Sequence, residues 1–135
     1  MRYSAFLFLL VLSISAFGDT IDLGRGDVEV LVPKNYSVNR PIPLVMLLHG
    51  YTSSGAAQDA YFKLSTLVDE YGFIFVAPDG TVEEEGGKNR FWNAGEKNCC
   101  NFQGSTVNDS AYLKTLIEAV QNRYSIDSKQ IFVTG

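Results

Sequence analysis

The residues best suited to chemistry follow an apolar run, in the stretch LVMLLHGYT. His49, Gly50, Tyr51 and Thr52 come directly after residues 44–48, which are all apolar. A glycine at the end of a buried strand lets the backbone turn close to a substrate, and a backbone N–H there can donate to the oxyanion of an acyl-transfer intermediate. We therefore expect the N–H of Tyr51 to be an oxyanion donor, with Thr52 beside it offering a hydroxyl or a second N–H.

The first eighteen residues have the pattern of a secretory signal peptide. Arg2 gives a positive start, residues 6–14 are nearly all apolar, and Ala16-Phe17-Gly18 supplies small residues for cleavage. The apolar run is well short of the roughly 20 residues that span a bilayer, which argues against a membrane anchor. We expect cleavage after residue 18, an N-terminal part of one domain in residues 19–135, and a secreted or otherwise extracytoplasmic protein with no membrane contact after cleavage.

The composition of the 135 residues is that of a folded chain, with 46% hydrophobic and 19% charged residues. Its formal net charge of −4 argues against nucleic acid or anionic lipid as a partner. The sequence contains no cluster of residues with metal-ligand spacing, no phosphate-binding glycine loop and no cofactor motif. We therefore expect neither a metal nor a cofactor.

The chain has two cysteines, Cys99 and Cys100, which are adjacent. Export would place them in an oxidising compartment, where thiols tend to pair. Either they bond to each other in a strained ring, or one or both have partners outside these residues.

Four segments have the composition of β-strands. In residues 27–33, three valines at every second position alternate with Asp27, Glu29 and Leu31, which predicts a strand with one wetter face near a sheet edge. Residues 44–48 and 73–77 are apolar throughout and too short for typical helices, as expected of strands buried on both faces of a parallel sheet. Residues 131–134 are β-branched or aromatic and predict a further buried strand.

Two segments have apolar residues at helical spacing. The first predicts a helix within residues 52–72, ending at Gly72, and the second predicts a helix from Asn108 or Asp109 to Tyr124. The apolar positions are Tyr61, Leu64, Leu67, Val68 and Tyr71 in the first helix, and Leu113, Leu116, Ile117 and Val120 in the second. Residues 81–106 between them have no clear period, and long loops in compact domains are often functional.

Strands that alternate with helices predict an α/β domain with a mainly parallel sheet, whose ligands bind at the carboxyl ends of the strands. A nucleophile elbow has the form Gly-x-Ser-x-Gly at the end of such a strand, and the last residues, IFVTG, reach its first glycine. We therefore expect the chain to stop two residues before its nucleophile, so that the Ser, Asp and His of a catalytic triad are all absent from it.

His49 is the only histidine, and it precedes the predicted nucleophile strand. The triad of α/β-hydrolases runs Ser, then Asp or Glu, then His, so His49 cannot be the base. It either contacts substrate or is a satisfied buried imidazole in a plain strand-to-helix turn. The same order excludes Asp79 and Asp109 as the triad acid. We therefore interpret Asp79 as a turn residue and Asp109 as a helix cap.

Five segments, in this order and spacing, resemble the secreted polyhydroxybutyrate depolymerase and feruloyl esterase family of α/β-hydrolases over residues 26–135. They are PLVMLLHGYTSSG, LVDEYGFIFVAPDGT, FWNAGEKNCC, VNDSAYLKTLIEAVQNRYSID and KQIFVTG. The resemblance implies an α/β-hydrolase fold truncated after the nucleophile strand. It also implies a secreted serine carboxylic-ester hydrolase, of which this fragment, lacking the triad, would be inactive by itself.

The resemblance also implies a substrate and residues that border it. The substrate would be a hydroxyalkanoate polyester or oligomer, or a feruloyl or acetyl ester of a plant polysaccharide. His49, Gly50, Trp92 and Asn93 would lie at the substrate, with Trp92 packing against an apolar acyl or aromatic group. The alternative for Trp92 is an aromatic anchor that pins the long loop.

Two other functions are consistent with the sequence. One is a non-catalytic, truncated binding remnant. The other is an α/β-hydrolase that acts on peptide or lactone bonds, because a fold does not fix a function.

Overall fold

The computed structural model describes residues 19–84, 87–95 and 99–135, so the predicted signal peptide lies outside the described residues. Within them, a five-stranded sheet has the order β1-β2-β4-β3-β7. The strands are β1 (Asp19–Asp22), β2 (Asp27–Leu31), β3 (Ile42–Leu47), β4 (Ile74–Val76) and β7 (Ile126–Thr134). β4, β3 and β7 are parallel, whereas β1 and β2 pair antiparallel with each other and β2 pairs antiparallel with β4. The sheet is therefore mixed, with a parallel part at the predicted strands.

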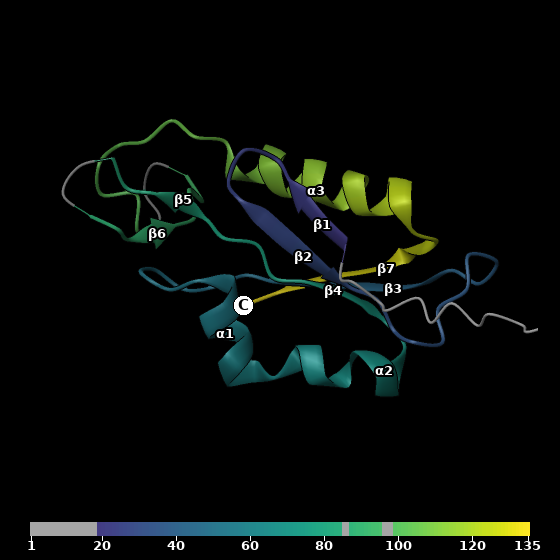
Figure 1. Ribbon diagram of the computed structural model, residues 1–135. Coiled ribbons are helices and arrows are strands. Elements are labelled where there is room, and N and C mark those ends of the chain that lie inside the picture. The colour runs from purple at the N-terminus through teal and green to yellow at the C-terminus, as the bar shows by residue number, and fades with distance from the viewer. Residues whose placement is uncertain (1–18, 85–86, 96–98) are drawn as a thin grey trace, which may run out of the picture.

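Helices cover both faces of this sheet (Figure 1). Helix α3 (Asp109–Arg123) lies on one face, and α1 (Gly55–Phe62), η1 (Leu64–Leu67) and α2 (Val68–Tyr71) lie on the other. Asn108 caps α3, because its side chain accepts a hydrogen bond from the Ala111 N–H at 2.9 Å. The predicted start of this helix is confirmed, with Asn108 rather than Asp109 as the cap.

The single helix predicted within residues 52–72 is wrong. Lys63 has a left-handed backbone with φ of 60° and ends α1, after which η1 and α2 follow. Asp59 stabilises this break because its side chain accepts a hydrogen bond from the Ser65 N–H at 3.0 Å. Tyr61 and Tyr71, predicted on the apolar face, are 82% and 68% exposed. The end at Gly72 is confirmed, with φ of 69° and its N–H donating to the Val68 carbonyl.

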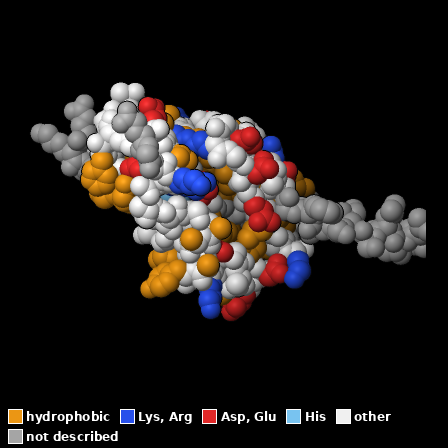
Figure 2. All heavy atoms as spheres, turned by 60° about the vertical axis from the view of Figure 1, so that its left-hand side comes forward, with side chains coloured by type: hydrophobic (Ala, Val, Ile, Leu, Met, Phe, Trp, Pro, Cys, Tyr) orange, Lys and Arg blue, Asp and Glu red, His pale blue; other side chains and the backbone are white. Residues whose placement is uncertain are grey.

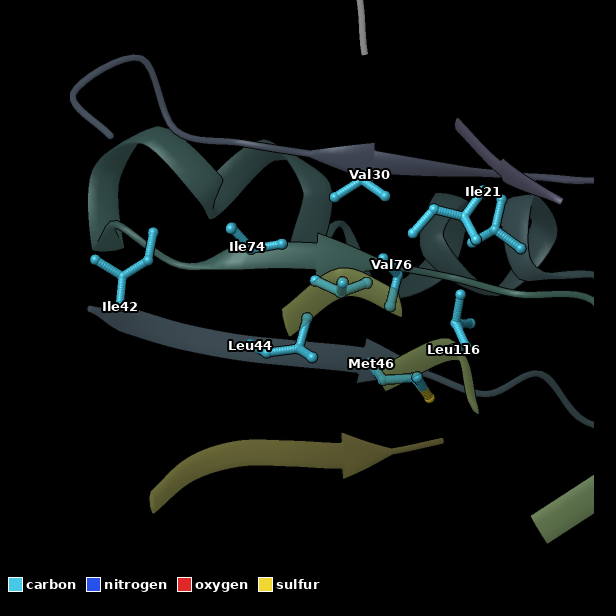
Figure 3. Close-up of a cluster of buried hydrophobic side chains, with 10 residues drawn as sticks. Ile21, Val30, Ile42, Leu44, Met46, Ile74, Val76 and Leu116 are labelled. Carbon is cyan, nitrogen blue, oxygen red and sulfur yellow. The ribbon is translucent and has the colours of Figure 1, made fainter. Parts of the chain in front are cut away.

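The core consists of two apolar layers, one on each face of the sheet. The layer beneath α3 includes Ile21, Val30, Leu44, Met46, Ile74, Val76, Leu116 and Val120 (Figure 3). The layer beneath η1 and α2 is built from Leu47, Val68, Phe73 and Phe75. Because β3 and β4 contribute to both layers, the prediction that these two strands are buried on both faces is confirmed.

Strand β7 forms an edge of the described sheet and pairs with β3. The strand is present as predicted, but it begins at Ile126, and it is not buried: Phe132 and Val133 are 54% and 51% exposed. The prediction of a buried strand is therefore wrong for the described residues. The cause is that no described strand pairs with the edge of β7 opposite β3.

A small hairpin, β5 (Thr81–Val82) and β6 (Arg90–Phe91), forms within the segment predicted to have no regular structure. It extends beyond the end of the sheet at which β3 and β4 finish (Figure 1). In the part of the chain that the structure describes, no helix is long and apolar enough to cross a membrane.

Candidate active site

The candidate site lies at the carboxyl ends of β3 and β4. After β3 the chain continues into α1 on one face of the sheet, and after β4 it passes through the β5–β6 hairpin to α3 on the opposite face (Figure 1). Adjacent parallel strands whose connections leave toward opposite faces create a crevice at their carboxyl ends, and ligands of α/β sheets bind there. His49 to Thr52 follow β3 at this point, as predicted.

His49 connects the ends of the two strands. Its side chain is 3% exposed, its Nε2 accepts a hydrogen bond from the Gly80 N–H at 2.9 Å, and its Nδ1 donates to the Gly50 carbonyl at 2.7 Å. Only the neutral ring with its proton on Nδ1 satisfies both contacts. Both nitrogens are thus used within the protein, which fits the buried-imidazole alternative. A contact of His49 with substrate stays a prediction.

Gly80 allows this close approach of the two strand ends. A Cβ atom at this position would lie 2.4 Å from the Phe91 carbonyl oxygen and 3.3 Å from His49 Nε2. Any side chain would therefore push the hairpin or the imidazole away.

The turn after Gly50 leaves one backbone donor unused. The Thr52 N–H donates to the Arg90 carbonyl at 2.9 Å, and the Ser53 N–H donates to the Gly50 carbonyl at 3.1 Å. Among the hydrogen bonds between described residues, none involves the Tyr51 N–H. The Tyr51 N–H is therefore available to a ligand, and its role as an oxyanion donor stays a prediction, whereas Thr52 keeps only its hydroxyl for the predicted second contact.

Thr52 has a backbone conformation that is unusual for its type, with φ of 68°. A β-branched residue in the left-handed region is strained, and such strain persists only where surrounding contacts hold it. The hydrogen bond to Arg90 on β6 is such a contact. The hairpin therefore fixes the turn that presents the Tyr51 N–H.

The Tyr51 side chain is held by the hairpin. Its hydroxyl donates to Glu83 Oε1 at 2.6 Å, and Asn89 Nδ2 donates to Glu83 Oε2 at 2.8 Å. The hydrogen bond to the Glu83 carboxylate raises the pKa of the Tyr51 phenol above its ordinary value of 10.0. Its ring also meets the Phe102 ring edge to face, with centroids 5.4 Å apart.

Trp92 packs on His49, with ring centroids 5.2 Å apart, and its Nε1–H donates to the His49 carbonyl at 3.0 Å. Asn93 binds its own loop instead: its Nδ2 donates to the Ser105 and Val107 carbonyls at 3.2 and 2.8 Å. Trp92 therefore anchors the long loop at the site, and the Asn93 amide is used within that loop. Contacts of either residue with substrate stay predictions.

Asp79 and Asp109, the two carboxylates weighed as triad acids, both have other partners. Asp79 accepts a hydrogen bond from the Gly55 N–H at 2.8 Å and lies 3.0 Å from Arg90 Nε. It therefore fixes the start of α1 and the hairpin together.

Asp109 is not the helix cap that the sequence favours but a buried carboxylate, 3% exposed. It pairs with Arg25 and accepts hydrogen bonds from the Thr81 hydroxyl at 3.1 Å and from the Asn93 N–H. Its position in the first turn of α3 also favours a negative charge. Asp109 thus ties the β1–β2 turn, the hairpin and the long loop to one helix. The sequence offered no signal for this set, because its members are far apart along the chain.

The structure joins Cys99 and Cys100 to each other by a disulfide, the first of the two alternatives that the sequence left open. Cys100 has a left-handed backbone with φ of 89°. Among the described residues, no group of three or more His, Cys, Asp or Glu side chains could hold a metal ion.

Comparison with known proteins finds no matching family model but two similar esterases. The bifunctional acetylxylan esterase/xylanase XynS20E of Neocallimastix patriciarum is 28% identical over 109 residues, which cover 81% of this chain and 14% of that protein. The probable acetylxylan esterase A of Aspergillus niger is 29% identical over 122 residues, which cover 90% of this chain and 37% of that protein. The chain thus spans less than two fifths of either relative. Neither is named as a polyhydroxybutyrate depolymerase or feruloyl esterase, so that finer resemblance stays a prediction.

Proposed function

We propose that this chain belongs to a carboxylic-ester hydrolase acting on acylated polysaccharides, and that it contributes an oxyanion donor, the Tyr51 N–H. The observation that carries the proposal is the turn after β3. There the Tyr51 N–H has no partner among the described residues, while the next two N–H groups along the chain are both engaged.

The surroundings of this donor suit the role. When a nucleophile attacks an ester carbonyl, the carbonyl oxygen becomes an oxyanion, and a donor that is already oriented stabilises it without reorganising during the reaction. The turn is fixed by His49, which holds Gly80, and by Thr52, which bonds to Arg90 on β6. A fixed backbone donor at the carboxyl end of a parallel strand meets this requirement.

An α/β-hydrolase fold is the architecture that we propose for the whole domain. The parallel arrangement of β4, β3 and β7 and the helices on both faces support it. In such a domain a serine would attack the ester, aided by a histidine base that an acidic residue orients. The proposal assigns none of these three roles to residues 1–135.

Acetyl groups on a xylan are the esters that we propose first, because both similar proteins are named as acetylxylan esterases. Feruloyl esters and hydroxyalkanoate oligomers, which the sequence resemblance implies, are the next substrates to compare. The signal-peptide pattern of residues 1–18 supports secretion, which would bring the enzyme to such a polymer.

Acetate release tests the proposal directly. The protein expressed from its full reading frame should release acetate from acetylated xylan faster than ferulate from methyl ferulate. Replacing Tyr51 with its α-hydroxy acid analogue exchanges the N–H for an ester oxygen and keeps the side chain. This change should lower kcat by about 10²- to 10³-fold.

Tyr51→Phe is the matched control, because it keeps the N–H and removes only the hydroxyl. Its kcat should stay within a few-fold of the parent. Equal activity of the α-hydroxy variant and the parent would exclude the oxyanion role, and an absence of ester hydrolysis by a folded full-frame protein would exclude the function.

A further inference from the structure

Tyr51 and Phe102 form a pair of aromatic rings beside the candidate oxyanion donor. Their centroids are 5.4 Å apart and their planes meet at 77°. Phe102 is 73% exposed and Tyr51 is partly exposed. The Tyr51 ring and the Tyr51 N–H belong to one residue, so the pair lies within one side-chain length of the donor.

The Tyr51 ring is held in place before any ligand arrives. Its hydroxyl is bonded to Glu83, and Asn89 Nδ2 contacts both the hydroxyl, at 3.5 Å, and the Glu83 carboxylate, at 2.8 Å. A side chain that is already immobilised loses little conformational entropy on binding. Of the two rings, Tyr51 is therefore preorganised, and Phe102 contacts it edge to face.

The chemistry around the pair matches a sugar. One face of a pyranose ring is made of C–H groups that pack on an aromatic ring, and its rim carries hydroxyls. Glu83 and Asn89 supply acceptors and donors next to the rings, and a carboxylate can accept more hydrogen bonds than Tyr51 donates. The net charge of −4 favours a neutral polymer over an anionic one. Acidic and basic side chains are interspersed with hydrophobic ones on the face that Figure 2 shows.

We propose that Tyr51 and Phe102 form a stacking platform for a sugar ring of a neutral polysaccharide main chain, which holds the acylated sugar beside the Tyr51 N–H. This inference rests on the proposed function, because the polysaccharide is taken from the names of the two similar proteins. It adds the residues that would bind the main chain, as distinct from those that would act on the ester.

The chain contains a matched control pair, Tyr61 and Phe62, at the last two positions of α1. Their ring centroids are 5.3 Å apart, with planes at 77°, and they are 82% and 43% exposed. Among the described residues, the Tyr61 hydroxyl has no hydrogen-bond partner. This pair has nearly the same ring geometry, but it lacks the hydrogen bonds that hold Tyr51, and it lies at the far end of α1 from the Tyr51 turn.

Binding of xylohexaose to the full chain tests the platform without turnover. Binding of xylohexaose is followed by isothermal titration calorimetry and by the fluorescence of Trp92, the only tryptophan. Phe102→Ala should raise the Kd for xylohexaose at least tenfold, and Tyr51→Phe, which frees the ring from Glu83, should raise it about threefold. Tyr61→Ala and Phe62→Ala should leave the Kd unchanged. Circular dichroism should show the same fold for all variants, because each altered ring is partly or largely exposed.

Three results would overturn the platform. The first is an unchanged Kd in Phe102→Ala, the second is an equal loss in Tyr61→Ala, and the third is Phe102-dependent binding of methyl ferulate with no binding of xylohexaose. Acetate release separates this inference from the proposed function. Retained binding without ester hydrolysis would refute the function alone, whereas unchanged hydrolysis and xylan binding in Phe102→Ala would refute the platform alone.

Discussion

The sheet and the loops at its carboxyl end are held together by different kinds of contact. Leu44, Ile74 and Leu116 represent the sheet, where fully buried apolar side chains pack between strands and α3. Where the loops meet the sheet, the buried polar groups are His49, after β3, and Asp109, in the first turn of α3, each bonded to backbone or side chains from other segments.

This difference determines how each region should respond to change. Apolar packing is non-directional, so that neighbours compensate in part for a lost side chain. A buried polar network depends on every member, because one deletion leaves a partner desolvated and unpaired. The loops that present Tyr51 should therefore be sensitive to small chemical changes, whereas the sheet should be sensitive to volume.

Asp109→Ala should have the largest effect. It leaves the partly buried Arg25 without its counter-charge and removes the acceptor for Thr81 and the Asn93 N–H. We expect a loss of about 3–5 kcal/mol in the free energy of unfolding, measured by urea titration. The emission of Trp92 should also shift in the native state, because Trp92 adjoins Asn93. Asp19→Ala, which removes an exposed partner of Arg123, is the control and should change little. A small effect of Asp109→Ala would contradict the central role of this carboxylate.

Leu116→Ala tests the apolar side of the comparison on the same helix. Leu116 is fully buried in the layer between α3 and the sheet. Truncation should cost about 2–5 kcal/mol of unfolding free energy through lost burial and a residual cavity. The native emission of Trp92 should stay unchanged, unlike in Asp109→Ala. Leu116→Met, which conserves volume, should cost less than about 1.5 kcal/mol. If both α3 variants shifted Trp92 equally, the two regions would not be distinct.

His49→Phe keeps an aromatic ring but removes the acceptor for the Gly80 N–H. Leaving that donor unpaired should cost about 1–3 kcal/mol of unfolding free energy. In hydrogen exchange, the Gly80 amide should lose protection while the amides of β3 keep theirs. Tyr71→Phe, at an exposed site, serves as the comparison and should be neutral. Loss of protection throughout β3 would show that the imidazole supports the sheet and not only the loop.

The smallest effect should come from the surface ion pair of Lys34 and Asp69. The hydrogen bond from Lys34 holds the pKa of Asp69 below its ordinary value of 3.8. A lowered pKa in the folded state means that the stabilisation is present above pH 3.8 and is lost as the pH falls through the folded value. Asp69→Asn should therefore reduce the acid sensitivity of unfolding slightly. The difference should shrink further at high salt, because the pair is exposed. If Asp69→Asn and the parent had the same acid sensitivity at low salt, the ion pair would make no contribution to the free energy of unfolding.

The sheet and α3, which are held together by apolar packing, are also the part of the fold that the sequence predicts. Period and apolar composition locate β2, β3, β4 and α3, because these elements must bury one or two faces. β1 and the β5–β6 hairpin are missed because they are short and contribute few buried residues. The break after α1 is missed because it depends on one local hydrogen bond to Asp59, which leaves no periodic signal.

The candidate site is predicted in position but not in its supporting contacts. The order of a buried strand, His49, Gly50 and Tyr51 indicates the turn, since it needs only neighbouring residues. The link from His49 to Gly80 and the set around Asp109 join segments distant in sequence, and any polar residue could fill such roles. Their geometry emerges only once the strands have brought those segments together.

The backbone N–H and the side chain of Tyr51 have separate proposed roles, and this separation has an evolutionary consequence. Its N–H belongs to the main chain, so every residue except proline at this position would keep the donor. Its side chain instead contacts Glu83 and Phe102. Point mutation can therefore change the surface that we propose for the polymer and still keep the backbone N–H that we propose as the donor.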